Sequence, residues 1–153
     1  MVVLPAGTGP RQIRLGPGAR TAYVLGELSA ELITVALKPG RAGEIVDRRP
    51  AWMSEPSGAN LPAHLLVADG RLYVSHRGHD RITVFSLENG LPVARKEIET
   101  GAWPRHFAIA GGWLYVADQL GEQVSARLLA SPDLAVVRPS QMAVRAPTCV
   151  LPL

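Results

Sequence analysis

The sequence predicts an all-β chain made of three copies of one four-stranded antiparallel unit. A Tyr-Val pair recurs at Tyr23, Tyr73 and Tyr115, so the copies are spaced by 50 and 42 residues. Short β-branched or aromatic segments alternate with glycine-bearing turns, and no segment sustains a helical period. Glycine and proline supply 15 and 13 of the 153 residues, a turn-rich composition. Four strands every 40 to 50 residues are typical of the blades of a β-propeller.

The strands of the first copy follow a Gly-Pro-Arg start and a Gly-Pro-Gly turn. They are expected at residues 9–15, 21–25, 32–35 and 44–47. Residues 29–38 also match a short helix. We interpret them as a strand, because Ile33-Thr34-Val35 aligns with Ile82-Thr83-Val84 of the second copy.

The second and third copies repeat the pattern through an Asp-Gly turn and a Gly-Gly turn. Their strands are expected at residues 61–67, 72–75, 81–85 and 94–100, and at 103–109, 113–117, 123–126 and 134–137. A loop at 50–62 joins the first two units. The resulting blades are 9–50, 60–101 and 102–138, with a terminal strand at 146–153.

Three blades are fewer than a closed ring needs, because propellers close with four to eight. We therefore expect an open arc, a partial propeller, with two uncovered flanks. Unpaired strand edges and uncovered faces favour association with another chain. Self-association through the blade edges is the partner prediction that follows.

Composition and charge exclude several other classes. The net charge is +3, and the fourteen arginines are scattered without a basic run, which does not favour nucleic-acid binding. Cys149 is the sole cysteine, so there is no internal disulfide framework. There is no apolar run long enough for a membrane span, and residues 1–7 do not resemble a signal peptide. The prediction is a cytoplasmic protein that does not bind a membrane.

Hairpin symmetry brings charged residues to one rim of the arc, where first strands begin and second strands end. Arg11 is symmetric with Glu27, and Arg105 with Asp118. The residues expected to share this rim are Arg11, Glu27, Arg77, Arg105, His106 and Asp118. A concave, cation-rich site suits an anionic ligand. Cross-strand ion pairs that only hold the blades together are the alternative.

Three other candidates are weaker. His76 and His79 are spaced so that they could share a metal ion, but no further ligands complete a set, so no metal or other cofactor is predicted. His64 is expected to be a structural histidine of the core. Cys149 has no identifiable base beside it, so a catalytic thiol is not expected.

Several motifs together resemble the seven-bladed propeller lactonases, which include bacterial 6-phosphogluconolactonase and fungal carboxymuconate cyclase. These motifs lie at residues 7–11, 26–28, 75–80, 82–85, 101–107 and 146–150. The resemblance covers this whole chain and the C-terminal half of the family's chains. It implies that Arg11, Glu27 and Arg77 are catalytic, and that a further catalytic histidine comes from an earlier blade absent from this sequence.

Three residues depart from the family pattern: Gln12 replaces a histidine, and Gly26 and His76 replace asparagines. The charged groups are kept, so these changes bear on substrate range rather than on the type of chemistry. We expect Gln12, His79, Arg105 and His106 to bind substrate.

The predicted function is hydrolysis of an anionic sugar lactone such as 6-phosphogluconolactone. Glu27 is then the general base or acid, and Arg11 and Arg77 neutralise the carbonyl oxygen and the anion. We expect the chain to be inactive or incomplete without further blades. Two alternatives remain: a lactone-forming cyclase of the carboxymuconate type, which would use the same groups, and a non-catalytic propeller fragment or binding module.

Overall fold

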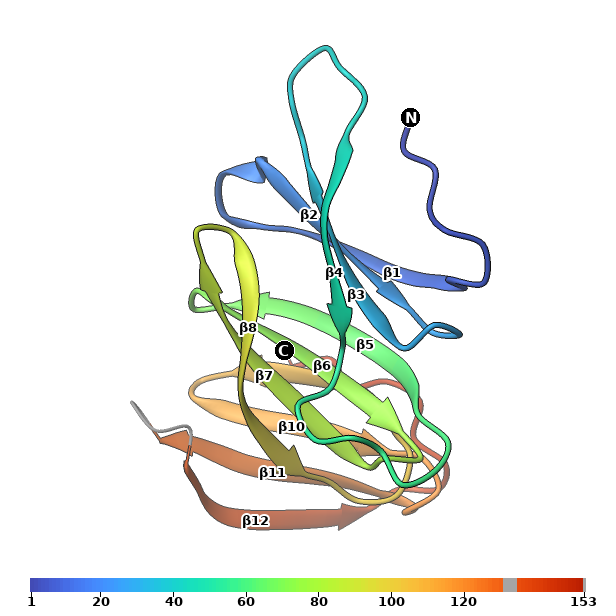
Figure 1. Cartoon of the computed structure of the whole chain (residues 1–153). Coiled ribbons are helices and arrows are strands. Elements are labelled where there is room, and N and C mark those ends of the chain that lie inside the picture. Colours follow the sequence, from blue (N-terminus) through green and yellow to red (C-terminus); the bar gives the residue numbers. More distant parts are fainter. Residues whose placement is uncertain (131–134, 153) are drawn as a thin grey trace.

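The computed structural model describes residues 1–130 and 135–152 and contains three four-stranded antiparallel sheets (Figure 1). Each sheet is built from consecutive strands, and we call the sheets blades 1, 2 and 3. Blade 1 consists of β1 (Pro10–Leu15), β2 (Thr21–Gly26), β3 (Glu31–Ala36) and β4 (Glu44–Pro50). Blade 2 consists of β5 (Leu61–Ala68), β6 (Arg71–Arg77), β7 (Arg81–Glu88) and β8 (Leu91–Glu99). Blade 3 consists of β9 (Pro104–Ala110), β10 (Trp113–Asp118), β11 (Gln123–Ala130) and β12 (Ala135–Ala143).

The all-β class and the partial propeller are confirmed, and β3 occupies the segment that also matched a helix. Leu134, at the start of the last expected strand of blade 3, lies outside the described residues. The terminal strand expected at 146–153 is not found: residues 144–152 are irregular, because no described strand pairs with them. Within the described part, the single helical turn, Pro17–Ala19, is too short to cross a membrane.

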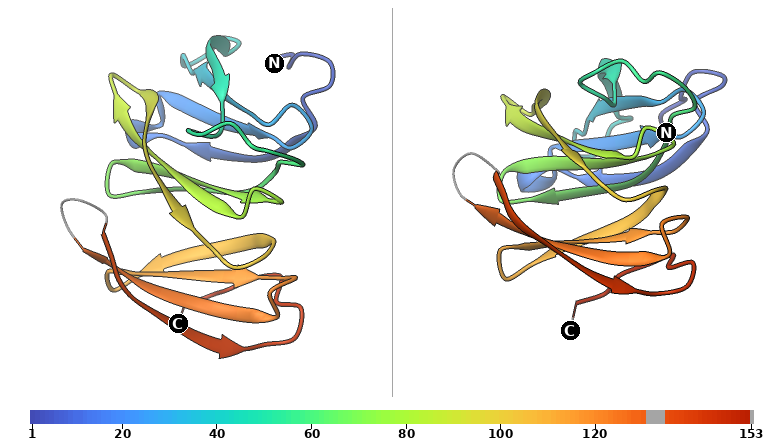
Figure 2. Two further views of the ribbon diagram at one scale, coloured as in Figure 1. Left: turned by 60° about the horizontal axis from the view of Figure 1, so that its bottom comes forward. Right: turned by 90° about the horizontal axis from the view of Figure 1, so that it is seen from below.

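The blades follow one another as stacked layers, from blue to red in Figure 2. Contacts between blades involve their first and second strands: β1 and β2 lie against β5, and β5 and β6 lie against β9. The first strands therefore form the inner row of the arc. Groups at the ends of these strands meet across blade boundaries.

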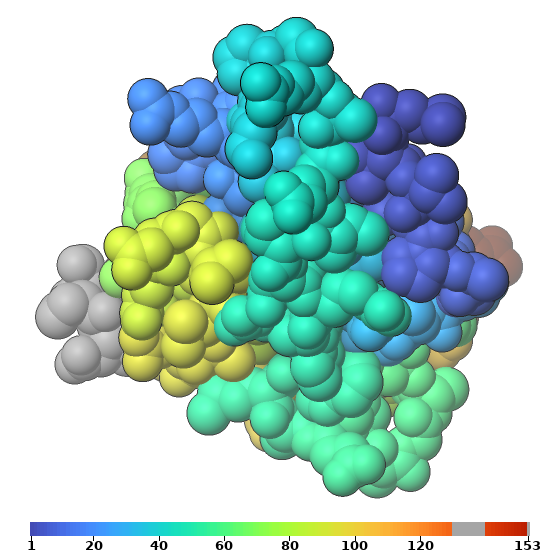
Figure 3. All heavy atoms as spheres, turned by 45° about the horizontal axis from the view of Figure 1, so that its top comes forward, coloured from blue at the N-terminus to red at the C-terminus, as the bar shows by residue number. Residues whose placement is uncertain are grey.

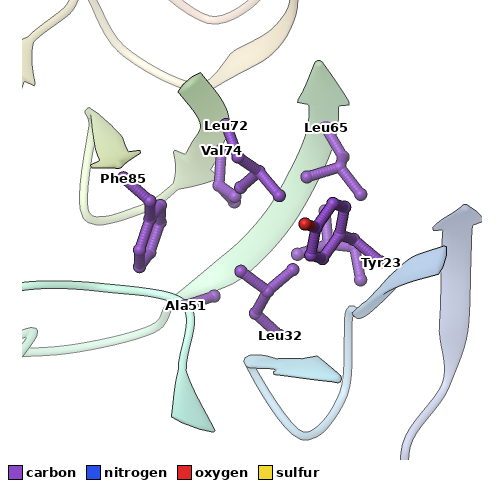
Figure 4. Packing of buried hydrophobic residues seen from close by; sticks show 8 residues of the cluster. Tyr23, Leu32, Ala51, Leu65, Leu72, Val74 and Phe85 are labelled. Atoms are coloured by element: carbon purple, nitrogen blue, oxygen red, sulfur yellow. The ribbon is translucent and has the colours of Figure 1, made fainter. Parts of the chain in front are cut away.

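A tyrosine from each of the first two blades is buried against the next blade. Tyr23 is fully buried among apolar side chains of blades 1 and 2 (Figure 4). Its hydroxyl donates a hydrogen bond to the carbonyl of Gly90 in the β7–β8 turn at 2.9 Å. Tyr73 is buried in the same way, with its ring centroid 6.4 Å from that of Phe107. The first of these interfaces contains Tyr23, Leu25, Leu32, Ala51, Leu65, Leu72, Val74 and Phe85. Because each large apolar side chain contributes about 1.5–3 kcal/mol when buried, packing between blades stabilises the arc strongly.

β4 and the connection from β4 to β5 cross one face of the molecule, cyan to green in Figure 3, and β4 lies beside the yellow β7–β8 turn. Arg49 of β4 fastens this region, because its guanidinium donates to the carbonyl of Pro92 and to both carboxylate oxygens of Asp47. This link ties the outer strand of blade 1 to blade 2.

Each first strand contains an irregularity beside its proline. The pairing of β1 skips Arg11, that of β5 skips Ala63, and that of β9 skips Arg105. A bulge of this kind leaves one residue out of the ladder and turns its side chain from the regular alternation. Simple hairpin symmetry, which assumes an unbroken ladder, therefore misplaces residues beyond these points.

The outer face of blade 1 lacks a neighbouring blade. Ile13 is 56% exposed, whereas Leu65 and Phe107, at the equivalent positions of blades 2 and 3, are fully buried. Val2 and Leu4 cover part of this face and line, with Ile13, a hollow of about 590 Å³. This uncovered face is the flank of blade 1.

We expect the chain to self-associate through this flank, as its sequence predicted. Ile13→Arg should then raise the dissociation constant of the oligomer at least about 10-fold, because association would bury an unpaired charge. Light scattering over a concentration series measures the effect. Leu120→Arg changes a 65%-exposed leucine in the β10–β11 turn and serves as the control. A wild-type chain that stays monomeric throughout the series contradicts the expectation.

Candidate functional site

Glu27 lies between two arginines from different blades. It follows β2, and its Oε2 lies 3.2 Å from Nη1 of Arg11 in β1. Its Oε1 accepts a hydrogen bond from Nη2 of Arg77, the last residue of β6. Burial acts to raise the pKa of Glu27, but the hydrogen bond and the charges of Arg77 and Arg11 outweigh burial, so the pKa is lowered. Glu27 is therefore a carboxylate at neutral pH.

The backbone of β5 holds both arginines. Nε of Arg11 donates to the carbonyl of Ala63 at 2.6 Å, and Nε of Arg77 donates to the carbonyl of Leu61 at 3.2 Å. Each guanidinium thus uses one nitrogen for the scaffold and another for Glu27. The cross-strand pair that could have been purely structural, Arg11 with Glu27, is extended by Arg77 into a cluster that spans two blades.

A pocket of about 390 Å³ opens beside Arg11. It is lined by Arg11, Gln12, Ala63, His64, Arg105, His106 and Thr148. Gln12 is fixed there because its Oε1 accepts a hydrogen bond from the backbone of Leu65 at 2.6 Å. Nη1 of Arg105 donates to Oε1 of Gln119 at 3.1 Å. The structure therefore brings together the predicted residues Arg11, Gln12, Arg105 and His106.

Two histidines form one wall of this pocket. The ring centroids of His64 and His106 are 3.9 Å apart, with the planes inclined at 42°. Burial, His106, Arg14 and Arg11 together lower the pKa of His64 to about 3. Burial and Arg14 also lower the pKa of His106, whose Nδ1 accepts a hydrogen bond from the backbone of Val150 at 3.3 Å. Two uncharged rings therefore offer hydrogen bonds rather than positive charge.

His64 was expected to be a structural histidine, yet it lines the pocket. A signal in the sequence could have shown this. His64, Gln12 and His106 each stand two residues after the proline of their first strand. This position directly follows the bulge in each blade, and all three side chains line the same pocket.

Two predicted residues lie elsewhere. Nε2 of His79 lies 3.5 Å from Oε1 of Glu97 in the outer strand β8, apart from the pocket. Asp118 does not pair with Arg105, because the bulge places Asp118 opposite Pro104. It is fully buried, and its Oδ2 accepts hydrogen bonds from Gln123 at 3.0 Å and Ser125 at 2.9 Å. Burial raises its pKa despite these bonds.

Among the described residues, no three His, Cys, Asp or Glu side chains gather as metal ligands. His76 is fully buried, with Nδ1 3.0 Å from Oδ1 of Asn60 and Nε2 3.1 Å from Oγ1 of Thr83. Both of its ring nitrogens therefore have protein partners.

The fold and the site define an arc of propeller blades with a cationic, carboxylate-bearing site beside its inner strands. Comparison with known proteins agrees with this class. The family model described as "Lactonase, 7-bladed beta-propeller" matches residues 1–152. The chain belongs to the seven-bladed β-propeller lactonase family.

Curated relatives match the chain over most of its length. It is 32% identical over 156 residues to the 6-phosphogluconolactonase of Bacillus subtilis, a match that covers 94% of this chain and 44% of that protein. It is 37% identical over 121 residues to an uncharacterized protein of Staphylococcus epidermidis, covering 74% of this chain and 35% of the relative. The chain thus spans less than half the length of these relatives, in keeping with a resemblance to part of the family's fold.

Solved structures show the same fold. The periplasmic gluconolactonase of Pseudomonas aeruginosa superimposes with a TM-score of 0.84 at 22% identity, over 96% of this chain and 43% of that one. A protein from Lactobacillus plantarum gives a TM-score of 0.88 at 22% identity, over 97% and 46%. The three blades therefore have the arrangement found in larger propellers.

The site should contribute to stability in a pH-dependent way. Because the pKa of Glu27 is lower in the folded chain than its ordinary 4.5, ionised Glu27 stabilises the fold above that pH. This stabilisation is lost as the pH falls below 4.5 through the folded-state value. Urea unfolding should therefore show a steeper acid loss of stability for the wild type than for Glu27→Gln. Parallel pH profiles for the two proteins would contradict this coupling.

Proposed function

We propose that this chain supplies part of the active site of a lactonase that hydrolyses an anionic sugar lactone such as 6-phosphogluconolactone. The observation that carries the proposal is the ionised Glu27 held between Arg11 and Arg77, with Arg11 also lining the 390 Å³ pocket. The family and the name of the Bacillus subtilis relative support this reaction class. A cytoplasmic location remains a prediction.

Hydrolysis requires water to add to the lactone carbonyl and the ring C–O bond to break. In the proposed mechanism Glu27 accepts a proton from the attacking water, and the arginines stabilise the oxyanion of the tetrahedral intermediate. When the intermediate collapses, the proton passes to the departing ring oxygen, which becomes the hydroxyl of the open-chain acid. The lowered pKa of Glu27 favours the base role over the acid role at the start of the cycle.

A carboxylate with a lowered pKa is also a weak base. Most of the rate enhancement in this proposal therefore comes from the positive charge of Arg11 and Arg77 near the developing oxyanion. The same arginines that weaken the base stabilise the charge it helps to create.

Substrate binding is assigned to the pocket. Arg105 suits the phosphate or carboxylate of the substrate, because a guanidinium can bind either group with two parallel hydrogen bonds. Gln12, His64 and His106 are uncharged and suit the hydroxyl groups of a sugar. His79 lies against Glu97, and we assign it to support of that region rather than to substrate contact.

A lactonase assay with 6-phosphogluconolactone tests the catalytic assignment. We expect turnover above spontaneous hydrolysis only where self-association or further blades complete the ring, and there Glu27→Gln should lower kcat about 100-fold or more. Glu31→Gln is the matched control and should retain activity, because it changes a carboxylate of β3 that pairs with Arg48 of β4. Wild-type turnover that survives in Glu27→Gln would exclude Glu27 as the base. Binding of 6-phosphogluconate without any turnover would favour a binding module.

Calorimetric titration with 6-phosphogluconate and with inorganic phosphate tests the binding assignment. His64→Leu should weaken 6-phosphogluconate about 3- to 10-fold through loss of a hydrogen bond, and leave phosphate affinity unchanged. Arg105→Gln should weaken both ligands. Equal affinities in the wild type and His64→Leu would show that His64 does not contact the sugar.

A further inference from the structure

Trp103 has a backbone conformation that bulky residues rarely adopt. Its φ is +62°, and it precedes Pro104, which by itself favours an extended conformation at the preceding residue. The equivalent residue of blade 1 is Gly9, with φ +57°. In both blades the carbonyl of this residue accepts a backbone hydrogen bond, from Glu27 at 2.8 Å and from Gln119 at 3.0 Å. The bend is thus shared by two blades, and glycine adopts it without strain.

The tryptophan adds its ring to this bend. Cζ of Arg77 lies 5.7 Å from the centroid of the indole, within the range of a cation–π interaction. Arg77 is 6% exposed and donates to Glu27 and to the carbonyl of Leu61. The indole therefore contacts the guanidinium that completes the Glu27 cluster.

Asp80 holds the backbone of Trp103. Its Oδ1 accepts hydrogen bonds from the backbone N–H groups of Trp103 at 2.9 Å and Gly78 at 3.1 Å. Contacts thus run without interruption from Asp80 through Trp103 and Arg77 to Glu27. Strained conformations persist only where the surroundings enforce them, and they are concentrated at functional sites.

We propose that Trp103 is a positioning residue, whose indole holds the guanidinium of Arg77 in the orientation that binds Glu27. The strain at position 103 is kept because glycine, which would relieve it, has no ring. An effect of Trp103 on catalysis rests on the proposed lactonase function. Its effect on the geometry of Arg77 and Glu27 can be measured without turnover.

Carboxyl NMR titration of Glu27 in the full chain tests the proposal. Arg11 and Arg77 are the charged groups that face Glu27, and the hydrogen bond from Arg77 acts to lower its pKa. Trp103→Gly should therefore raise the pKa of Glu27, and Trp103→Phe, which keeps an aromatic face, should raise it less. Trp113→Leu changes a tryptophan that lines a separate pocket on blade 3 and should leave the titration unchanged.

Asp80→Ala keeps the test decisive if Trp103→Gly does not fold. It should raise the pKa of Glu27 in the same direction, because the backbone of Trp103 is no longer held. An unchanged Glu27 titration in folded Trp103→Gly, or in both Asp80→Ala and Trp103→Phe, overturns the proposal. If the chain hydrolyses lactone, kcat of Trp103→Gly should fall about 2- to 5-fold. Absence of wild-type turnover would count against the lactonase function and leave the titration result standing.

Discussion

The packing of each blade on the next is the constraint on which the rest of the structure depends. A four-stranded sheet of this kind has two apolar faces and cannot bury both of them alone. Tyr23 and Tyr73 are buried at the two interfaces between blades, where the first strands also contact one another. The Glu27 cluster lies at the first of these interfaces, because Glu27 belongs to blade 1 and Arg77 to blade 2. The geometry of the candidate site and the folding of the arc therefore depend on one set of contacts.

Under the proposed function, the arginine and glutamate cluster is both a structural ion pair and the reactive part of the site. Removing charges from water is costly unless each polar atom has a partner. Here the carbonyls of Leu61 and Ala63 satisfy the Nε atoms, and Glu27 accepts from the outer nitrogens. The guanidinium groups are thereby fixed before any ligand arrives. Such preorganisation is what electrostatic stabilisation of an oxyanion requires.

Local pattern predicted most of the fold, because Tyr-Val pairs and glycine turns report strands directly. The same pattern, with the family motifs, brought Arg11, Glu27 and Arg77 together. Asp118 was misplaced because simple hairpin symmetry ignores the bulge after Pro104, and one skipped residue changes every pairing beyond it. His79 was expected among the substrate-binding residues, whereas it contacts Glu97 of β8, a residue 18 positions along the chain that no local pattern links to it. Burial of His64 was predicted, but its place in the pocket was not, because that place depends on His106 from another blade.

The repeated bulge has a consequence for how the blades differ from one another. Positions 11, 63 and 105 are the same place in three copies, occupied by arginine, alanine and arginine. The small residue in the middle copy leaves its carbonyl accessible, and the guanidinium of Arg11 binds there. A third arginine would crowd two cations already present. Equivalent positions have thus become complementary rather than identical, since two copies supply charge and the copy between them supplies the room and the acceptor that keep this charge in place.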